Sequence, residues 1–97
     1  MFVIPADRKL GSHAVRRARR WRGLRFATRE EVLDMTGLAP GSIPPFGSLF
    51  GLPTLCDERL GDNQMINFNA GDHCISVSMR YADYVLAEQP QLGRYAE

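Results

Sequence analysis

The run Gly41-Ser42-Ile43-Pro44-Pro45-Phe46-Gly47 is the most distinctive stretch of this sequence. Its glycines let the backbone approach a ligand closely and expose amide N–H groups, while its prolines fix neighbouring dihedral angles and reduce the entropy of the loop. A loop of this composition is suited to cradle an oxyanion or a phosphate. The alternative is a rigid surface turn, which the same glycines and prolines also favour.

Patterns on both sides of this run predict short strands and helices. Apolar or alternating runs predict strands over residues 2–4, 24–27, 52–56, 65–68 and 74–79. Helical periodicity predicts helices over residues 12–22, 29–36 and 78–88, with glycine-rich and proline-rich loop from 37 to 53. Helices packed on a small mixed sheet form an α+β, or mixed α/β, arrangement. A chain of 97 residues has room for one domain, so we expect residues 1–97 to form a single unit.

Local signals place the ends and inner faces of these helices. In the first, Val15 and Trp21 lie on the apolar side, and Gly23 is the expected stop. Thr28 and Glu31 have the spacing of a capping box, and Gly37 stands where a left-handed residue ends a helix. The side chains expected to face inward from the second and last helices are Val32, Leu33, Met35, Tyr81, Tyr84, Val85 and Leu86.

Composition narrows the classes of function. The net charge of +1, from 12 basic and 11 acidic residues, gives no global attraction to nucleic acid. Arginines nevertheless cluster on the first helix, and Arg16, Arg19 and Arg20 are candidates to contact nucleic-acid phosphates. The alternative is a solvated helix face.

Cys56 and Cys74 have no metal-ligand spacing, so we expect no metal and no cofactor. No apolar run is long enough for a membrane span, and a reduced, cytoplasmic setting is expected.

Short pieces of this sequence, taken in order, resemble one protein family. They are Val3-Ile4-Pro5-Ala6-Asp7-Arg8-Lys9-Leu10, Arg25-Phe26-Ala27, Glu30-Glu31-Val32, Thr36-Gly37, Pro40-Gly41, Pro45-Phe46-Gly47, Leu52-Pro53, Asp57-Glu58, Leu60, Phe68-Asn69-Ala70-Gly71, His73 and Asp83. Each piece alone is unspecific, but the ordered set resembles the second half of the YbaK/ProX-like aminoacyl-tRNA editing domains. Members of that family hydrolyse the ester between a mischarged amino acid and the 3′ end of its tRNA.

The resemblance implies roles for individual residues. Gly41 and Pro45 would delimit the family's GxxxP loop and, with His73, carry catalysis. The residues implied in substrate binding are Lys9, Ser42, Ile43, Pro44, Phe46, Gly47 and Gly71. His73 would orient water or the substrate's amine, although a solvated turn histidine is an equal alternative. An aminoacyl ester is already activated, so positioned water suffices without a covalent nucleophile.

This sequence also departs from the family pattern. Full-length members carry upstream elements, including a lysine central to editing, and we expect this chain to lack that N-terminal portion. Its one lysine, Lys9, matches a later segment and does not inherit that role. Loss of the upstream strands would leave a sheet edge open, which a homodimer would cover.

Three functions follow from these observations. The first is trans-editing hydrolysis of mischarged aminoacyl-tRNA, with Ala, Pro or Cys as first candidates for the amino acid. The second is a non-catalytic module that binds tRNA or aminoacyl-adenosine. The third is an inactive fragment of a longer gene, which an in-frame lysine-bearing segment upstream would indicate.

Overall fold

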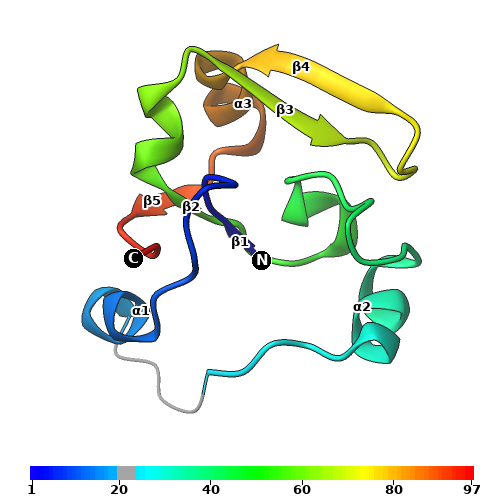
Figure 1. Cartoon of the computed structure of the whole chain (residues 1–97), viewed down its shortest axis with the longest axis horizontal. Helices are drawn as coiled ribbons and strands as arrows, with labels where there is room; N and C mark the ends of the chain where they lie inside the picture. The colour runs from blue at the N-terminus through cyan, green and yellow to red at the C-terminus, as the bar shows by residue number, and fades with distance from the viewer. Residues whose placement is uncertain (20–23) are drawn as a thin grey trace.

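The computed structural model of this chain describes residues 1–19 and 24–97. In chain order the elements are β1 (Phe2–Val3), α1 (Ser12–Arg19), α2 (Arg29–Thr36), the 3₁₀ helix η1 (Gly47–Phe50), β2 (Leu55–Asp57), the 3₁₀ helix η2 (Glu58–Asp62), β3 (Met65–Asn69), β4 (Ser76–Arg80), α3 (Tyr81–Glu88) and β5 (Gln91–Gly93). The expected mixture of short helices and strands is therefore confirmed (Figure 1).

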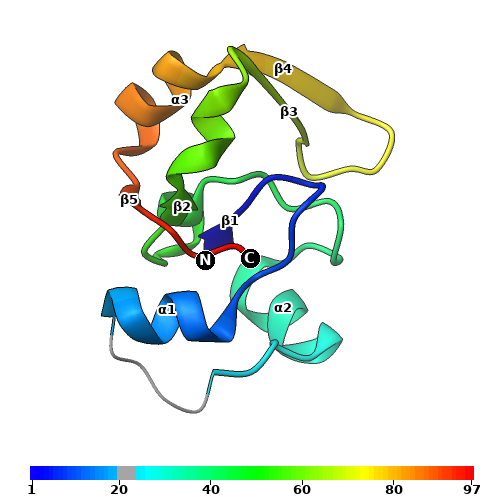
Figure 2. The same ribbon diagram turned by 60° about the vertical axis from the view of Figure 1, so that its left-hand side comes forward.

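The strands form two separate sheets. β1, β2 and β5 make a three-stranded parallel sheet with β2 in the centre, and Phe2 lies opposite Leu55 in its register. β3 and β4 make an antiparallel hairpin in which Ile66 lies opposite Met79. The hairpin lies at the end of the molecule opposite α1 and α2 (Figures 1 and 2). In the described part of the chain, the outer edge of β1 pairs with no other strand.

The central strand β2 divides the apolar interior into two clusters. Successive side chains of a strand point to opposite faces, so Leu55 packs with Val15 and Tyr95 while Cys56 packs with other residues on the opposite side. The second cluster contains Cys56, Ile66 and Tyr84, with Phe46, Phe68 and Met79 among the partly buried side chains around it. In this cluster the ring of Phe46 meets Tyr84 edge-on at a centroid separation of 5.2 Å. The distinctive loop is thereby anchored in the core through Phe46.

A buried carboxylate connects the parallel sheet to the end of the chain. Asp57 is fully buried and accepts hydrogen bonds from the Arg59 side chain and from the backbone N–H groups of Tyr95 and Ala96. Arg59 Nη2 also donates to the carbonyl oxygen of Ala96 over 2.6 Å. Residues 95 and 96 are consequently held against β2 by charge-assisted hydrogen bonds.

Several local predictions are confirmed. Thr28 and Glu31 form a reciprocal capping box at the start of α2, and Gly37 ends that helix with a left-handed φ of 73°. Val15 is buried, as its place on the apolar side of the first helix predicted. The predicted core role of Trp21 and the predicted stop at Gly23 lie outside the described residues.

Other predictions were wrong for reasons of tertiary context. Residues 24–27 form no strand, because alternation produces a strand only where a neighbouring strand pairs with it. The last helix begins at Tyr81 and not after Ser78, since Ser78 pairs with Asn67 in the hairpin. The residues expected to face inward but found exposed are Leu33, Met35 and Leu86.

The predicted loop from residue 37 to 53 is irregular apart from one short element. Residues 47–50 form the 3₁₀ helix η1, which Gly51 ends in a left-handed conformation. None of the described helices is long and apolar enough to cross a bilayer.

Candidate functional site

The loop from Gly41 to Gly47 connects α2 to η1 and is partly buried. Gly41 has a φ of 90°, a conformation that side-chain-bearing L residues rarely adopt. Ser42, Pro44 and Gly47 are buried, and the Ser42 hydroxyl donates to the Ala39 carbonyl over 2.7 Å. This burial rules out a solvated surface turn and leaves a loop built into the domain.

The turn of the β3–β4 hairpin holds the first half of this loop. Asn69 Nδ2 donates to the Gly41 carbonyl over 2.8 Å, and the Gly71 N–H donates to the Ser42 carbonyl over 2.7 Å. His73, in the same turn, lies so close to Gly41 that a Cβ added there would be 3.0 Å from its Cε1 atom. The fold therefore brings together four residues that the resemblance implied: Gly41, Ser42, Gly71 and His73.

Helix α3 holds the second half of the loop. The buried Tyr84 donates its phenolic proton to the Pro45 carbonyl over 2.6 Å. The Gly47 N–H donates to the Thr54 hydroxyl over 2.9 Å, and that hydroxyl in turn donates to the Glu88 carboxylate over 2.5 Å. Burial alone would raise the pKa of Glu88, but hydrogen bonds from Ser48 and Thr54 outweigh it and lower the pKa. Glu88 is thus kept ionised as an acceptor.

These contacts occupy carbonyl groups of the loop and leave a donor available. The carbonyls of Gly41, Ser42 and Pro45 all accept hydrogen bonds from the hairpin or α3. In a trans peptide the C=O and N–H bonds point in opposite directions, so the Ile43 N–H points away from Gly71. No group of residues 1–19 and 24–97 accepts a hydrogen bond from that N–H. Ile43 thus presents a preorganised donor of the kind that stabilises an oxyanion.

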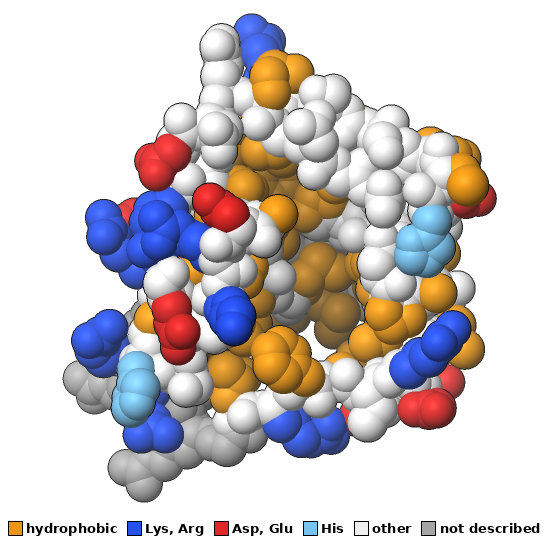
Figure 3. Space-filling view, viewed as in Figure 1, with side chains coloured by type: hydrophobic (Ala, Val, Ile, Leu, Met, Phe, Trp, Pro, Cys, Tyr) orange, Lys and Arg blue, Asp and Glu red, His pale blue; other side chains and the backbone are white. Residues whose placement is uncertain are grey.

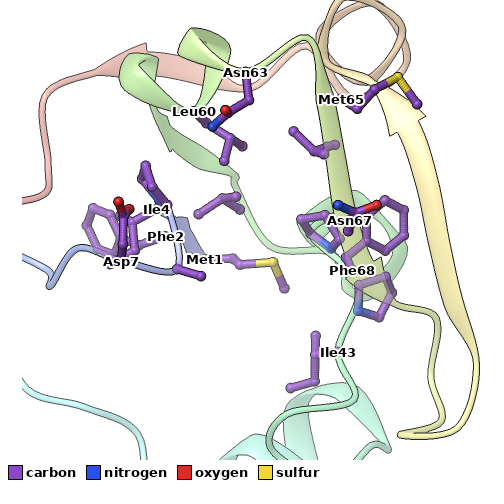
Figure 4. A pocket seen from close by; sticks show the side chains of 16 residues that line it. Met1, Phe2, Ile4, Asp7, Ile43, Leu60, Asn63, Met65, Asn67 and Phe68 are labelled. Carbon is purple, nitrogen blue, oxygen red and sulfur yellow. The ribbon is translucent and has the colours of Figure 1, made fainter.

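An open apolar cavity of about 860 Å³ lies against this loop. Hydrophobic side chains line its hollow in the space-filling view (Figure 3). Side chains from separate elements face this space, among them Met1 beside β1, Leu60 from η2, Phe68 from β3 and Ile43 from the loop (Figure 4). Asn63 and Asn67 add polar groups to its wall. A volume of about 300–1,000 Å³ is typical of small-molecule sites.

The thiol of Cys56 offers no nucleophile to this site. Cys56 is buried, and burial together with the charge of Asp57 raises the pKa of its thiol to about 11, so it stays protonated and unreactive. Within the described ranges no cluster of three histidine, cysteine or acidic side chains is arranged to hold a metal ion.

The remaining predicted residues lie on other segments. Lys9, in the connection from β1 to α1, does not line the cavity, and its carbonyl accepts the Glu97 N–H. Arg16 is exposed on α1 and Arg19 is half-buried on the same helix. Arg20 lies outside the described residues. Proximity to the loop therefore distinguishes His73 and Gly71 from the basic candidates.

Four residues that support the loop were given no role in the site by the sequence: Thr54, Asn69, Tyr84 and Glu88. Asn69 lies within the run Phe68-Asn69-Ala70-Gly71, which was noted for its resemblance and not for a role. Tyr84 is 39 positions from Pro45 in the chain, so no local spacing connects them. Their roles became visible once the chain was folded.

Known proteins resemble this chain in sequence and in fold. It is 38% identical over 76 residues to a multifunctional Ser/Thr-tRNA deacylase, ProXp-y, of Escherichia coli strain K12, and likewise to that of Escherichia coli O157:H7. The alignment covers 75% of this chain and 46% of the relative, so the chain spans about half the length of the curated relatives it matches.

Two solved structures share the fold at low identity. One is a scaffold protein used for computational grafting of linear epitopes, with a TM-score of 0.86, 21% identity, and coverage of 99% of this chain and 63% of that one. The other is the hypothetical protein APE2540, with a TM-score of 0.85, 18% identity, and coverage of 99% and 65%. Residues 1–86 match the aminoacyl-tRNA editing domain across nearly the whole chain, and this chain therefore belongs to that family.

Proposed function

We propose that this chain hydrolyses the ester bond of mischarged aminoacyl-tRNA. The observation that carries the proposal is the Ile43 N–H, which donates to no described group, in a loop whose Ile43 lines an open cavity. In the same loop, Gly41 lies against His73, which is not itself among the residues that line the cavity. The name of the Escherichia coli relatives, a Ser/Thr-tRNA deacylase, supports the same reaction class. Small amino acids are the proposed substrates: Ala, Pro and Cys from the family resemblance, and Ser and Thr from these relatives.

In the proposed reaction the oxygen of a water molecule bonds to the ester carbonyl carbon. The developing oxyanion accepts a hydrogen bond from the Ile43 N–H, while His73 takes a proton from the water. The carbon–oxygen bond to the terminal ribose then breaks, and the ribose oxygen receives a proton from His73. The products are a free amino acid and uncharged tRNA.

The decisive experiment incubates the purified chain in excess over tRNAs mischarged with Ser, Thr, Ala, Pro or Cys. We expect release of at least one amino acid faster than spontaneous hydrolysis. Esters that all stay intact over hours would contradict the proposed function for this chain alone.

Replacing His73 with alanine is expected to lower kcat by about 100-fold, since general acid–base groups typically contribute 10²–10⁴-fold. His13, which is exposed on α1, provides a matched control, and His13→Ala should leave the rate unchanged. Single-turnover deacylation measures both variants. Equal rates for His73→Ala and the wild type would remove His73 from the mechanism.

A non-catalytic module that binds tRNA or aminoacyl-adenosine is the second candidate. It is favoured by the position of Lys9, the one lysine of the given sequence, outside the cavity wall. In both candidates we propose that Arg16, Arg19 and Arg20 contact tRNA phosphates, and that Lys9 and the loop residues Ser42, Pro44, Phe46 and Gly47 belong to the substrate-binding region.

Replacing Arg16 with glutamate is expected to weaken tRNA binding and to reduce the magnitude of the slope of log K against log salt concentration by about 1, because each phosphate contact releases counterions. Fluorescence anisotropy with labelled tRNA measures this slope. Arg94→Glu is the control, since Arg94 lies near the chain end and pairs with Glu58. An unchanged slope for Arg16→Glu would indicate that α1 is a solvated helix face that does not contact tRNA.

We also propose that two copies associate through the outer edge of β1. The proposed setting is the cytoplasm, which the free thiols of the two cysteines support. An edge strand offers unpaired N–H and C=O groups to another strand. Light scattering after size exclusion should give a mass twice that of the 10.9 kDa chain. A folded monomer at micromolar concentration would contradict the dimer.

A further inference from the structure

Asn69 is the polar side chain that connects the hairpin to the loop. It is the last residue of β3, half-buried, and its Nδ2 atom donates to the Gly41 carbonyl over 2.8 Å. The Ser76 hydroxyl on the facing strand lies 3.4 Å from Asn69 Oδ1 and donates to it. That contact orients the amide so that its NH₂ group, and not its oxygen, faces the loop.

The Asn69 contact fixes the peptide between Gly41 and Ser42. Its carbonyl is held by Asn69, and its N–H, on the opposite side, donates to the Ala39 carbonyl over 3.1 Å. The next peptide is fixed in the same way, because its carbonyl accepts the Gly71 N–H two residues after Asn69. Two consecutive peptide planes are therefore set by one hairpin, and the second of them carries the Ile43 N–H.

We propose that Asn69 is a positioning residue for ester hydrolysis, which aims the Ile43 N–H at the oxyanion by holding the Gly41 carbonyl. This inference rests on the proposed function. Asn69 does not line the cavity, so it acts on the substrate through the loop and not by contact. Rotation of the first peptide would carry the second with it and move the donor off its target.

Asn69→Asp tests this inference most directly. It keeps the size of the side chain but places a carboxylate oxygen where Nδ2 now donates to the Gly41 carbonyl, so attraction becomes repulsion. A misplacement of about 1 Å is enough to cost roughly 100-fold in rate. We expect Asn69→Asp to lower the single-turnover rate constant by about 10- to 100-fold, while the concentration that gives the half-maximal rate changes less than about threefold, since the side chains that line the cavity are untouched. Ser78→Ala, an exposed position on β4, is the hairpin control.

Amide hydrogen exchange tests the same inference without activity. The Gly71 N–H should exchange faster in Asn69→Asp, whereas the Ala70 N–H, which donates to the Ile75 carbonyl within the hairpin, should keep its protection. Active wild type with an equally active Asn69→Asp, or unchanged protection at Gly71 in a folded variant, would overturn the positioning role alone. Inactive wild type would overturn the proposed function and, with it, a role of Asn69 in that reaction.

Discussion

Gly41→Ala is expected to reduce deacylation by about 100-fold or more while the chain stays folded. A Cβ at this position would lie 3.0 Å from His73 Cε1, and the φ of 90° is itself unfavourable for alanine. The strain is expected to be relieved by displacing His73 or by rotating the Gly41 peptide. Either movement separates the proposed base from the proposed oxyanion donor. Single-turnover deacylation measures the loss.

Two other glycines are controls in which an alanine would have the backbone strain but no steric clash. Gly37 and Gly51 also have left-handed φ values, of 73° and 69°, but a Cβ at either would meet nothing within 4 Å. We expect Gly37→Ala and Gly51→Ala to cost about 1 kcal/mol of unfolding free energy, as left-handed strain in general does, and to keep full activity. If all three variants lose activity equally, strain alone explains the effect and Gly41 has no special place in the site.

Asp57→Ala is expected to have the largest effect on stability. The side chain is fully buried, and its removal leaves Arg59 and the N–H groups of Tyr95 and Ala96 without their acceptor. Breaking a buried pair of this kind costs about 3–5 kcal/mol, a large part of the roughly 5–15 kcal/mol that stabilises a typical domain. Urea denaturation followed by circular dichroism measures the change. Residues 95 and 96 should detach from β2 first.

The exposed neighbour of Asp57 provides the comparison. Glu58 pairs with Arg94 in a bridge whose side chains are 47% and 70% exposed, so Glu58→Ala should cost less than about 1 kcal/mol. Equal losses for Asp57→Ala and Glu58→Ala would contradict the view that Asp57 holds residues 95 and 96 against β2.

Asp57 should also make stability depend on pH. Burial alone would raise its pKa, but the hydrogen bonds from Arg59, Ala96 and Tyr95 outweigh burial and lower it below the ordinary value of an aspartate. A carboxylate with a lowered folded-state pKa contributes full stability above its unfolded pKa of about 3.9 and loses it as the pH falls toward the folded value. Unfolding free energy should therefore decline below about pH 4, and Asp57→Asn should flatten that decline.

Much of the local structure could be predicted from single residues and short spacings. Thr28 and Glu31 form a capping box by sequence separation alone, and Gly37 ends the helix because few other residues adopt a positive φ. The hairpin strands followed from apolar or alternating runs. Such signals depend on neighbours along the chain, which is why they survive without knowledge of the fold.

Burial depended on the tertiary structure instead. The amphipathic spacing of Leu33 and Met35 predicted an inner face, yet both are about half exposed, because periodicity shows which side of a helix is apolar but not whether anything packs there. Alternation at residues 24–27 likewise predicted a strand that has no pairing partner in the described chain.

The candidate site shows the same division. By itself the sequence determined the composition of the loop, with Gly41 free to take a φ of 90° and the prolines limiting its dihedral angles. Only the tertiary structure decided which way its peptides face. The groups that hold them belong to Asn69, Gly71 and Tyr84, which are 28 to 39 positions away in sequence. Hydrogen bonds act over about 3 Å in space whatever the separation along the chain, so the direction of a peptide cannot be inferred from its neighbours in sequence.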